Sequence, residues 1–336
     1  MINERLRKKL LTLRLPNGGY IASTGSHYRK MWMRDTAIEV LPELLANPEL
    51  YKQTMHTLLD FYIKSQKTYN KFYWLITSPD NKYPFEFPHP RCDENLNEIP
   101  EEWGFIQMDV FGEVLYGIYL GEASGIKILR GHKDSWIITL IIEFLEAVKY
   151  WQLPDNAIWE ENREVHASSV GACVAGLTAI RLLGFEVPQW LIDKGHETLN
   201  NLLPFESETK DCDLALMTLI YPYNILEPQT ARTVLKNVED KLLRDRGVIR
   251  YKGDVYYSRD GKEAEWCFGL GYLSLCYSQL GEFDKARYYR DLMIEKCLVN
   301  EDDIPELFFG GTDEPNPNTP LGWSLAMAIL ALENKI

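Results

Sequence analysis

The sequence predicts an all-α protein in which helical hairpins close into a ring. Apolar residues recur at helical spacing through most of the 336 residues, and this pattern is typical of amphipathic helices with one solvated side. Between these helices lie segments that are apolar all round, and a helix without a polar face must be surrounded by others. The two kinds tend to alternate, so we expect buried inner helices paired with half-exposed outer ones.

The alternation is clearest in the middle of the chain. Residues 132–151 are of the outer type, because Trp136, Ile137 and Leu140 share one helical face while Glu143 lies on another. Residues 170–180 (VGACVAGLTAI) are of the inner type, since they include no charged residue. Over the whole chain the pattern predicts about twelve helices, at residues 2–14, 35–46, 48–66, 108–123, 132–151, 168–184, 188–204, 212–221, 228–244, 264–281, 283–297 and 319–333.

The chain reads as one domain. No Gly/Ser-rich or Pro-rich linker divides it, so we interpret residues 1–336 as a single domain. The segment LGEFDKARYYRDL (280–292) is typical of a helical-repeat hairpin, which makes an open solenoid the competing architecture. A solenoid would be extended in solution, whereas a closed ring would be compact.

The composition argues against several classes of partner. The net charge is −13, so we expect neither a nucleic acid nor an anionic membrane to bind. No stretch approaches the roughly 18 apolar residues of a membrane-spanning helix. The first residues, MINERLRKKLLTLRLP, lack the apolar segment of a signal peptide, and we therefore expect a cytoplasmic protein. An uncharged small molecule fits this composition better as a partner.

The cysteines and histidines do not indicate a metal or a cofactor. The six cysteines lack a C-x-x-C spacing and the six histidines lack an H-x-x-x-H spacing. Most cysteines lie in apolar helical patterns, so we expect reduced thiols in the core. We also see no nucleotide-binding glycine loop. The sequence predicts neither a metal site nor a cofactor.

Tryptophan, tyrosine, arginine and carboxylates gather just before the predicted inner helices. Six segments show this, at 27–36 (HYRKMWMRDT), 101–109 (EEWGFIQMD), 158–162 (IWEEN), 208–213 (ETKDCD), 248–257 (VIRYKGDVYY) and 303–318 (DIPELFFGGTDEPNPN). In a closed ring of hairpins, the inner helices start at one rim. Acidic residues such as Glu160 and Glu161 also suit the first turn of a helix, but six such segments favour a common site.

This set of side chains is typical of a carbohydrate site. Aromatic rings stack on the apolar faces of sugar rings, while Asp and Arg bond the hydroxyl groups. Cleavage of a glycosidic bond needs one carboxylic acid to protonate the leaving oxygen and one carboxylate to activate water. The spacing of the carboxylates does not by itself say which two act.

From about residue 20 to its end, the chain resembles the glucoamylase-type glycoside hydrolases of family 15. Six motifs carry the resemblance, namely WMRD (32–35), WGFIQMDVFG (103–112), IWEEN (158–162), RYKGDVYY (250–257), IPEL (304–307) and PLGWS (320–324). A further motif, ASSVG (167–171), is similar to the branch shared with the N-terminal halves of the phosphorylase kinase α and β regulatory subunits. The resemblance implies an (α/α)6 barrel, also called a six-hairpin toroid.

The resemblance also implies roles for individual residues. Glu160 matches the general acid of the family and Glu306 the general base. Burial against aromatic residues, with Glu161 and Asp35 nearby, would raise the pKa of Glu160 and keep it protonated. Contact with the sugar is implied for the other motif residues, which are Trp32, Arg34, Asp35, Trp103, Gln107, Asp109, Trp159, Glu161, Arg250, Tyr251, Asp254 and Trp323.

Together these motifs predict an exo-acting, inverting α-glucosidase that releases glucose from the non-reducing ends of short α-glucosides. Leu307 departs from the pattern, since many hydrolases of the family have Gln after the base, whereas the kinase-subunit branch has Leu. A non-catalytic carbohydrate-sensing module is therefore the alternative, and a trehalase or another (α/α)6 hydrolase is an alternative within enzymes. The glycosidic linkage, the accepted chain length and the oligomeric state stay open.

Overall fold

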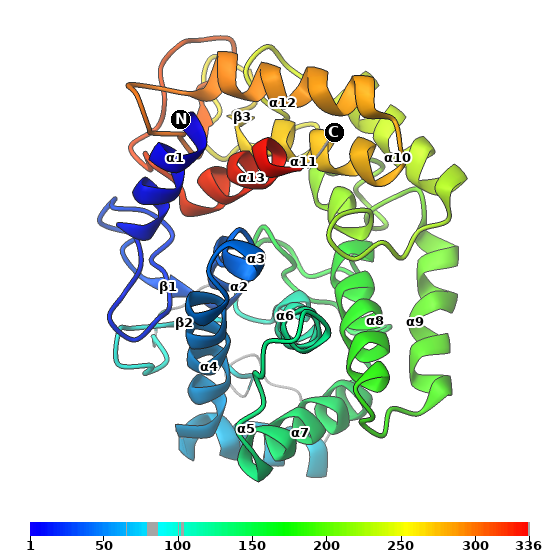
Figure 1. The fold of residues 1–336 in the computed structure, drawn as a ribbon. Helices are drawn as coiled ribbons and strands as arrows, with labels where there is room; N and C mark the ends of the chain where they lie inside the picture. Colours follow the sequence, from blue (N-terminus) through cyan, green and yellow to red (C-terminus); the bar gives the residue numbers. More distant parts are fainter. Residues whose placement is uncertain (65, 79–86, 100, 102–103, 335–336) are drawn as a thin grey trace. The chain divides into compact units, whose positions relative to one another are not determined.

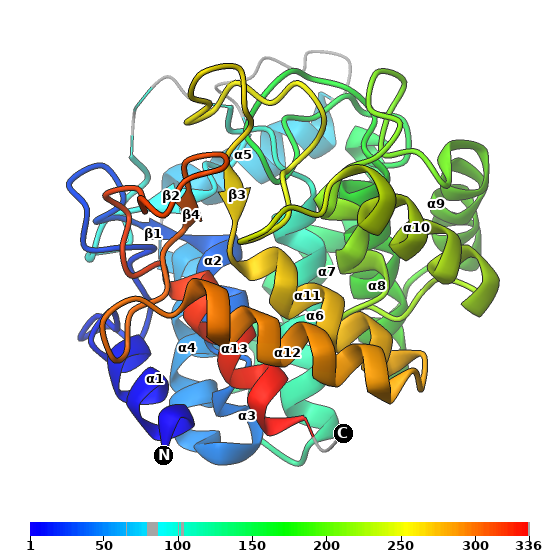
Figure 2. The same cartoon turned by 90° about the horizontal axis from the view of Figure 1, so that it is seen from above.

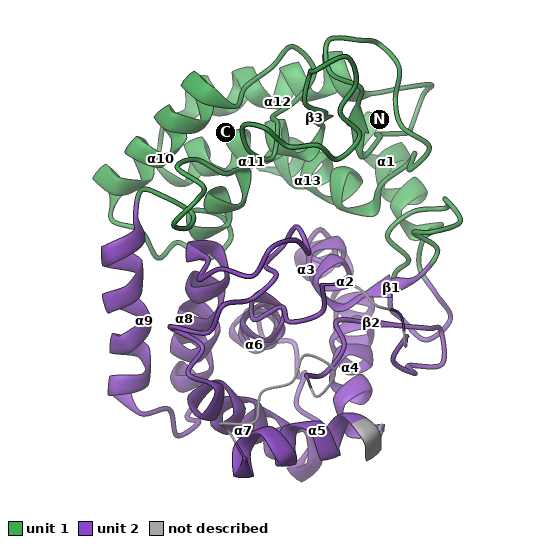
Figure 3. Ribbon diagram, turned by 180° about the vertical axis from the view of Figure 1, so that it is seen from behind, with its two compact units in different colours: residues 1–14, 20–29, 204–336 green, residues 15–19, 30–203 purple. Residues whose placement is uncertain are grey.

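The computed structural model describes residues 1–64, 66–78, 87–99, 101 and 104–334, and these are mostly α-helical (Figure 1). The chain forms two compact units (Figure 3). Unit 1 comprises residues 1–14, 20–29 and 204–336, and unit 2 comprises residues 15–19 and 30–203. Each unit contains helices of both expected types, and we describe the two in turn.

Unit 2 contains eight of the helices, which are α2 (Met33–Glu39), α3 (Glu43–Ala46), α4 (Pro48–Lys64), α5 (Gln66–Thr77), α6 (Asp109–Ala123), α7 (His132–Val148), α8 (Ala167–Leu182) and α9 (Gln189–Leu202). Strand β1 (Met31–Trp32) directly precedes α2, and strand β2 (Arg91–Cys92) follows α5 in the sequence. The two short strands pair antiparallel. Every residue of α2 is buried, so α2 is of the inner type. Helices α4, α7 and α9 each bury one face, as predicted for outer helices.

Helices α6 and α8 of unit 2 pack against each other. Their backbones approach at two glycines. A Cβ built on Gly112 would lie 2.2 Å from the carbonyl oxygen of Ala172, and one on Gly176 would lie 2.4 Å from that of Gly112. Contact at this distance is possible only without a side chain, so these glycines fix how closely the two inner helices pack.

Unit 1 contains α1 (Ile2–Leu11), the 3₁₀-helix η2 (Leu214–Leu219), α10 (Pro228–Lys241), α11 (Phe268–Gln279), α12 (Phe283–Cys297) and α13 (Gly322–Glu333). The strands β3 (Glu265–Trp266) and β4 (Leu307–Phe308) pair antiparallel. Helix α11 packs on both α12 and α13, and the three lie side by side (Figures 1 and 2). The residues of α11 from Phe268 to Tyr277 are all buried, which confirms its inner type.

Two predicted helices differ from the observed elements. The range 35–46 is broken, because α2 ends at Glu39 and α3 begins at Glu43. Pro42 lies between them, lacks an N–H donor and disfavours the helical conformation of the residue before it. The range 212–221 forms the shorter 3₁₀-helix η2, whose start is capped by the Asp213 carboxylate accepting from the Ala215 N–H at 2.8 Å.

Helix α5 is absent from the sequence prediction, which ends the preceding helix at residue 66. The segment is rich in aromatic residues, which have only moderate helix propensity, and its buried Phe72 and Leu75 give a weak periodic signal. Tertiary packing of α5 on α7 supplies the missing stabilisation.

The cysteines are as predicted, since all six are buried and free of disulfides. None of the helices in the described part of the chain combines the length and the apolarity that a membrane crossing requires.

The α6–α8 contact predicts a large effect of a small substitution. In Gly112→Ala, the added methyl group would meet the backbone of α8, which is unable to move aside as a flexible side chain would. We expect a loss of about 1–3 kcal/mol in the free energy of unfolding, measured by urea denaturation. The control is Glu146→Ala on the exposed face of α7, and equal stability of both variants would contradict this description of the contact.

Candidate active site

The turn that carries Glu160 lies before α8 and has an unusual backbone. Glu160 has a φ of +61°, in the left-handed region that non-glycine residues rarely occupy. The Glu160 N–H donates to the Ala157 carbonyl at 3.2 Å, and the Glu161 N–H donates to the Asn156 carbonyl at 3.1 Å. Such a conformation persists only where its surroundings enforce it, and it often marks a functional position.

The Glu160 side chain meets polar groups from two other segments of unit 2. Its Oε1 accepts hydrogen bonds from Trp32 Nε1 at 2.8 Å and from Gln107 Nε2 at 2.9 Å. The guanidinium of Arg34 lies 3.6 Å from the same oxygen. Trp32 is the last residue of β1, Arg34 lies in the first turn of α2, and Gln107 precedes α6. Residues predicted from three separate motifs therefore converge on one carboxyl oxygen.

Arg34 is the buried cation at the centre of this group. Its Nη1 donates to Gln107 Oε1 at 2.8 Å and to Asp109 Oδ2 at 3.3 Å, and its Nε lies 3.6 Å from Asp35 Oδ1. Burial acts to lower the pKa of Arg34, but the charges of Asp109, Asp35 and Glu160 outweigh it, so that the pKa is raised. The guanidinium therefore stays charged and holds the starts of α2 and α6 together.

The carboxyl groups around Arg34 outnumber the guanidinium charge. Burial raises the pKa of Asp109 despite its bond to Arg34. Glu39 lies one helical turn after Asp35 and is fully buried, and neither of its oxygens has a hydrogen-bond partner among the described residues. Burial, with a smaller contribution from Asp35, raises the pKa of Glu39 well above its ordinary value. The environment of Glu39 therefore favours the neutral form of its carboxyl group over the charged form.

The segment before α6 passes close to the Glu160 turn. A Cβ on Gly104 would lie 2.4 Å from the Glu160 carbonyl oxygen, so this position requires glycine. Asn156 links the two segments, because its Oδ1 accepts from the Ile106 N–H at 3.1 Å and its N–H donates to the Ile106 carbonyl at 2.7 Å. Trp103, predicted as a sugar platform beside Gly104, lies outside the described residues.

A buried pair that the sequence analysis does not single out fixes two helix starts. Asp155 Oδ2 accepts from the Met108 N–H at 2.9 Å, and its Oδ1 lies 3.0 Å from His166 Nδ1. Met108 precedes α6 and His166 precedes α8. No sequence signal identifies this pair, because an Asp and a His eleven positions apart form no known motif. Trp159 is buried and Glu161 half-buried in the same loop, and their contact with sugar stays a prediction.

In unit 1, Glu306 is buried and both of its oxygens accept hydrogen bonds. Oε1 accepts from the Tyr28 hydroxyl at 2.9 Å. Oε2 accepts from the Asn316 side-chain amide at 2.5 Å and from the Asn318 amide at 2.8 Å. The main chain is also held, because the Glu306 N–H donates to the Asn318 carbonyl and its carbonyl accepts from the Cys267 N–H. The carboxyl group is therefore fixed in one orientation.

The environment of Glu306 balances two opposing effects on its pKa. Burial raises the pKa of Glu306, while the hydrogen bonds from Asn318, Asn316 and Tyr28 act to lower it, and the net shift is upward. The Tyr28 hydroxyl is also 2.7 Å from that of Tyr256. The sequence analysis quotes the segments that contain these residues but does not name them, because Tyr and Asn serve many purposes in loops.

Arg250 and Asp254 form a bidentate ion pair beside the Glu306 segment. Arg250 Nε and Nη2 donate to the two Asp254 oxygens at 2.6 and 2.5 Å, and both side chains are buried. The guanidinium carbon lies 4.9 Å from the ring centre of Tyr256 and 5.7 Å from that of Tyr251. The pair thus positions aromatic rings that the motif RYKGDVYY supplies.

Two further residues of interest lie in the core of unit 1. The Trp323 ring stacks on Phe268 with centroids 4.7 Å apart, and its Nε1 donates to the Tyr272 hydroxyl at 3.3 Å, so Trp323 packs in the core, and its contact with sugar stays a prediction. Leu307 is fully buried in β4 opposite Trp266. Because successive residues of a strand point to opposite faces, Leu307 points away from the polar groups that hold Glu306.

Solved structures similar to this chain include glycosidases. A glycosidase variant in complex with glucose matches 99% of this chain and 96% of its own, with a TM-score of 0.80 and 19% identity. The glucoamylase of Saccharomycopsis fibuligera matches 98% of this chain and 94% of its own, with a TM-score of 0.70 and 15% identity. At these identities the likeness establishes the fold, and it confirms the predicted glucoamylase-like (α/α)6 toroid.

The likeness to these structures concerns the fold alone, whereas a match to a family model places the chain among the glycoside hydrolases at a general level. Residues 2–184, slightly more than half of the chain, match the family described as glycosyl hydrolases family 15. The chain belongs to this family, as the six motifs predict.

Two kinds of curated relative are similar to the chain. A probable phosphorylase b kinase regulatory subunit alpha of Caenorhabditis elegans is 26% identical over 286 residues, which cover 68% of this chain. An uncharacterized glycosyl hydrolase of Methanocaldococcus jannaschii is 24% identical over 370 residues, which cover 98% of this chain and 55% of that protein. The chain spans only 23% of the length of the Caenorhabditis elegans subunit.

The buried Glu39 predicts a dependence of stability on pH. A carboxyl whose pKa is raised in the folded state stabilises the fold below its unfolded pKa, and this stability is lost as the pH rises through the folded pKa. In Glu39→Gln that loss is absent, so we expect the variant to melt at a higher temperature than the wild type at pH 8. The difference should shrink toward pH 4 when melting is followed by circular dichroism.

The control for this measurement is Glu146→Gln, at an exposed position of α7. A difference between Glu39→Gln and the wild type that does not change with pH would contradict a neutral Glu39.

Proposed function

We propose that the protein is an exo-acting α-glucosidase that releases glucose from the non-reducing ends of short α-glucosides with inversion of configuration. Glu160 is assigned as the general acid and Glu306 as the general base. The observation that carries the proposal is the fully buried Glu306 carboxyl, held by three donors, because such a group is costly to bury and suited to act as a base. Membership of the family and the glucose-bound glycosidase of the same fold support a sugar substrate.

In the proposed reaction, Glu160 protonates the glycosidic oxygen while the bond from that oxygen to the anomeric carbon breaks. Since Glu160 Oε1 already accepts from two N–H donors, the transferred proton is carried on Oε2. Glu306 takes a proton from a water molecule, whose oxygen forms the new bond to the anomeric carbon on the opposite face. Inversion requires that the two carboxyls stand roughly 6.5–9.5 Å apart in the working enzyme.

The remaining predicted residues are proposed to bind the sugar. Buried Arg and Asp side chains are suited to bond hydroxyl groups, because their geometry is fixed before the sugar arrives. The aromatic rings would supply stacking faces. This group comprises Trp32, Arg34, Asp35, Trp103, Gln107, Asp109, Trp159, Glu161, Arg250, Tyr251, Asp254 and Trp323. We further propose that residues 1–336 act as one domain, without a cofactor, in the cytoplasm.

A carbohydrate-sensing module without catalysis is the second candidate. The similarity to proteins named as kinase regulatory subunits favours it, and Leu307 is shared with that branch of the resemblance. However, Leu307 packs in the core of unit 1 and leaves the hydrogen bonds of Glu306 intact. The substitution of Leu for Gln therefore does not by itself indicate a lost base.

The first test removes each assigned carboxyl. Glu160→Gln and Glu306→Gln should each lower glucose release from maltose or longer maltooligosaccharides by about 10²–10⁴-fold, because each lacks one proton-transfer group. Isomaltose and trehalose are assayed in parallel to identify the linkage. The anomer released by the wild type is followed by NMR, and inversion predicts β-glucose. Glu146→Gln serves as the control for removing a surface carboxyl.

Initial release of α-glucose would contradict inversion, and full activity of either variant would contradict its assigned role. No release from any of the four sugars, together with sugar binding detected by calorimetry, would favour the sensing module.

The amides that hold Glu306 predict a shift in pH dependence. Asn318→Ala removes a hydrogen bond that lowers the pKa of Glu306, so the pKa of the base should rise further and the acid limb of kcat/KM should move to higher pH. Activity should therefore fall more at pH 5 than at pH 8. Asn200→Ala, on the exposed face of α9, is the control, and an equal loss at all pH values would indicate a merely structural role for Asn318.

A further inference from the structure

Three aromatic side chains of unit 2 form a continuous, solvent-exposed row, which we call the aromatic ladder. Tyr73 and Tyr69 of α5 are stacked with ring centroids 6.4 Å apart, and Tyr69 lies 5.1 Å from Trp136 of α7. Tyr73 is 58% exposed and Trp136 is 40% exposed, with the half-buried Tyr69 between them. Aromatic rings are stabilised by burial, so a contiguous group of exposed rings is typical of a surface that binds a ligand.

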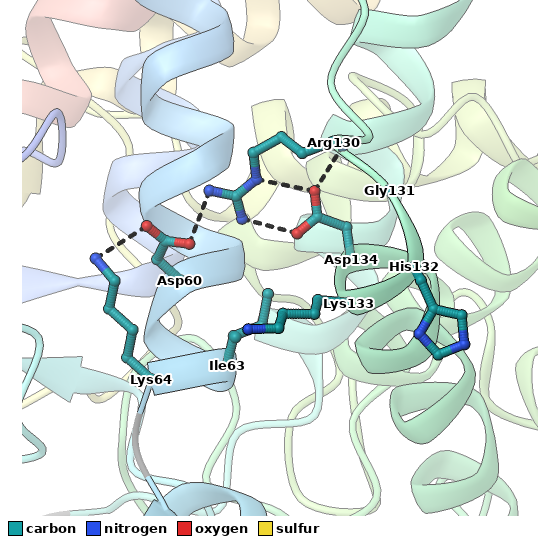
Figure 4. A pocket seen from close by; sticks show the side chains of 8 residues that line it. All are labelled: Asp60, Ile63, Lys64, Arg130, Gly131, His132, Lys133 and Asp134. Carbon is teal, nitrogen blue, oxygen red and sulfur yellow. Dashed lines mark hydrogen bonds and ion pairs between the residues drawn. The ribbon is translucent and has the colours of Figure 1, made fainter.

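A pocket of about 420 Å³ lies at the start of α7, where its last lining residue in the sequence is Asp134 (Figure 4). His132 and Lys133 line it, and they precede Trp136 by four and three residues. Because residues at these spacings share one helical face, two pocket residues lie one turn before Trp136 on the same face of α7. In Figure 4 the Lys133 side chain extends toward Ile63, across the pocket.

The charges in the pocket are largely neutralised by one another. Arg130 donates to Asp60 at 2.8 Å and, through Nε and Nη2, to Asp134 at 2.9 and 2.7 Å. Lys64 lies 3.0 Å from Asp60, and Figure 4 shows this row of ion pairs along one wall. The wall is therefore polar, held in place and nearly neutral, with Lys133 as a further donor.

We propose that the aromatic ladder and this pocket bind a neutral glucan chain at a second site. Sugar rings have flat apolar faces that stack on exposed aromatic rings, and a rim of hydroxyls that bonds paired charged groups. The ladder supplies exposed aromatic rings for stacking, and the pocket supplies paired charged groups that bond hydroxyls. None of the residues assigned to catalysis or to sugar contact above belongs to it. The proposal goes beyond the proposed function, since a chain is able to bind here whether or not it is hydrolysed.

The chemistry of this surface disfavours other occupants. An anionic ligand would need a large excess of cations, but Asp60 and Asp134 offset Arg130 and Lys64 and leave only Lys133. A membrane with anionic lipids is disfavoured by the net charge of −13. A neutral polyhydroxy chain satisfies both parts at once.

The test is native electrophoresis of the full chain in gels with and without glycogen. The wild type should be retarded by glycogen, and Trp136→Ala and Tyr73→Ala should each weaken the apparent affinity by about 5- to 30-fold, the range expected for loss of one stacking ring. Trp190→Ala is the matched control, because Trp190 is also exposed, at 47%, but lies on α9 against Trp151. Retardation of that variant should equal that of the wild type.

Three outcomes would overturn the proposal. The first is equal retardation of the ladder variants and the wild type by glycogen, and the second is a loss of retardation in Trp190→Ala equal to that in the ladder variants. The third is a wild type that sediments as a dimer and a Trp136→Ala variant that sediments as a monomer, which would assign the ladder to contact with a second copy of the chain. Circular dichroism checks that the variants fold. Glucose release from maltose, measured in parallel, reports the proposed catalytic function separately, because failure of that function would abolish release in the wild type without changing its retardation.

Discussion

The group of polar side chains around Glu160 in unit 2 depends on the buried guanidinium of Arg34. A charge taken out of water must be paired, and here one cation contacts carboxyl or amide groups from the start of α2, the segment before α6 and the Glu160 turn. Without it, the carboxyl groups of Asp35, Asp109 and Glu160 would lose a positive charge that lies within 3.6 Å of each of them. The arginine therefore determines both the geometry of the Glu160 site and the meeting of the segments that form it.

The two assigned carboxyls differ in what surrounds them. Glu160 shares the Arg34 guanidinium with Asp35 and Asp109, and burial raises the pKa values of Asp109 and of Glu39 in the same part of unit 2. Glu306 is held instead by neutral donors, two amides and a tyrosine hydroxyl. Pairs of carboxyls in contrasting environments are typical of acid–base catalysis, which is the physical basis of the proposed division of roles.

The sequence predicts the two types of helix well, because a half-exposed helix such as α7 repeats apolar residues on one face, whereas a surrounded helix such as α8 or α11 is apolar all round. It misses α5, where packing on α7 outweighs a weak pattern. In the site, motif residues such as Arg34 and Gln107 do meet at Glu160. The pairing of Asp155 with His166, and the donors Tyr28, Asn316 and Asn318, depend on contacts between distant segments, which no local pattern encodes. Trp323 shows the opposite case, since a motif residue has a full packing role in the core.

The contrast between Leu307 and Glu306 bears on whether the protein is an enzyme or a sensor. Leu307 packs on the core side of β4, where exchange of one side chain for another mainly alters packing. Glu306 lies among hydrogen-bond donors that serve no packing purpose, and an apolar residue in its place would avoid the desolvation cost of a buried carboxyl. A fold under selection for stability alone would lose such a group. The presence of Glu306, together with the three side chains that orient it, favours a function that requires a carboxyl group in a fixed position. Hydrolysis requires such a group more directly than sugar binding does.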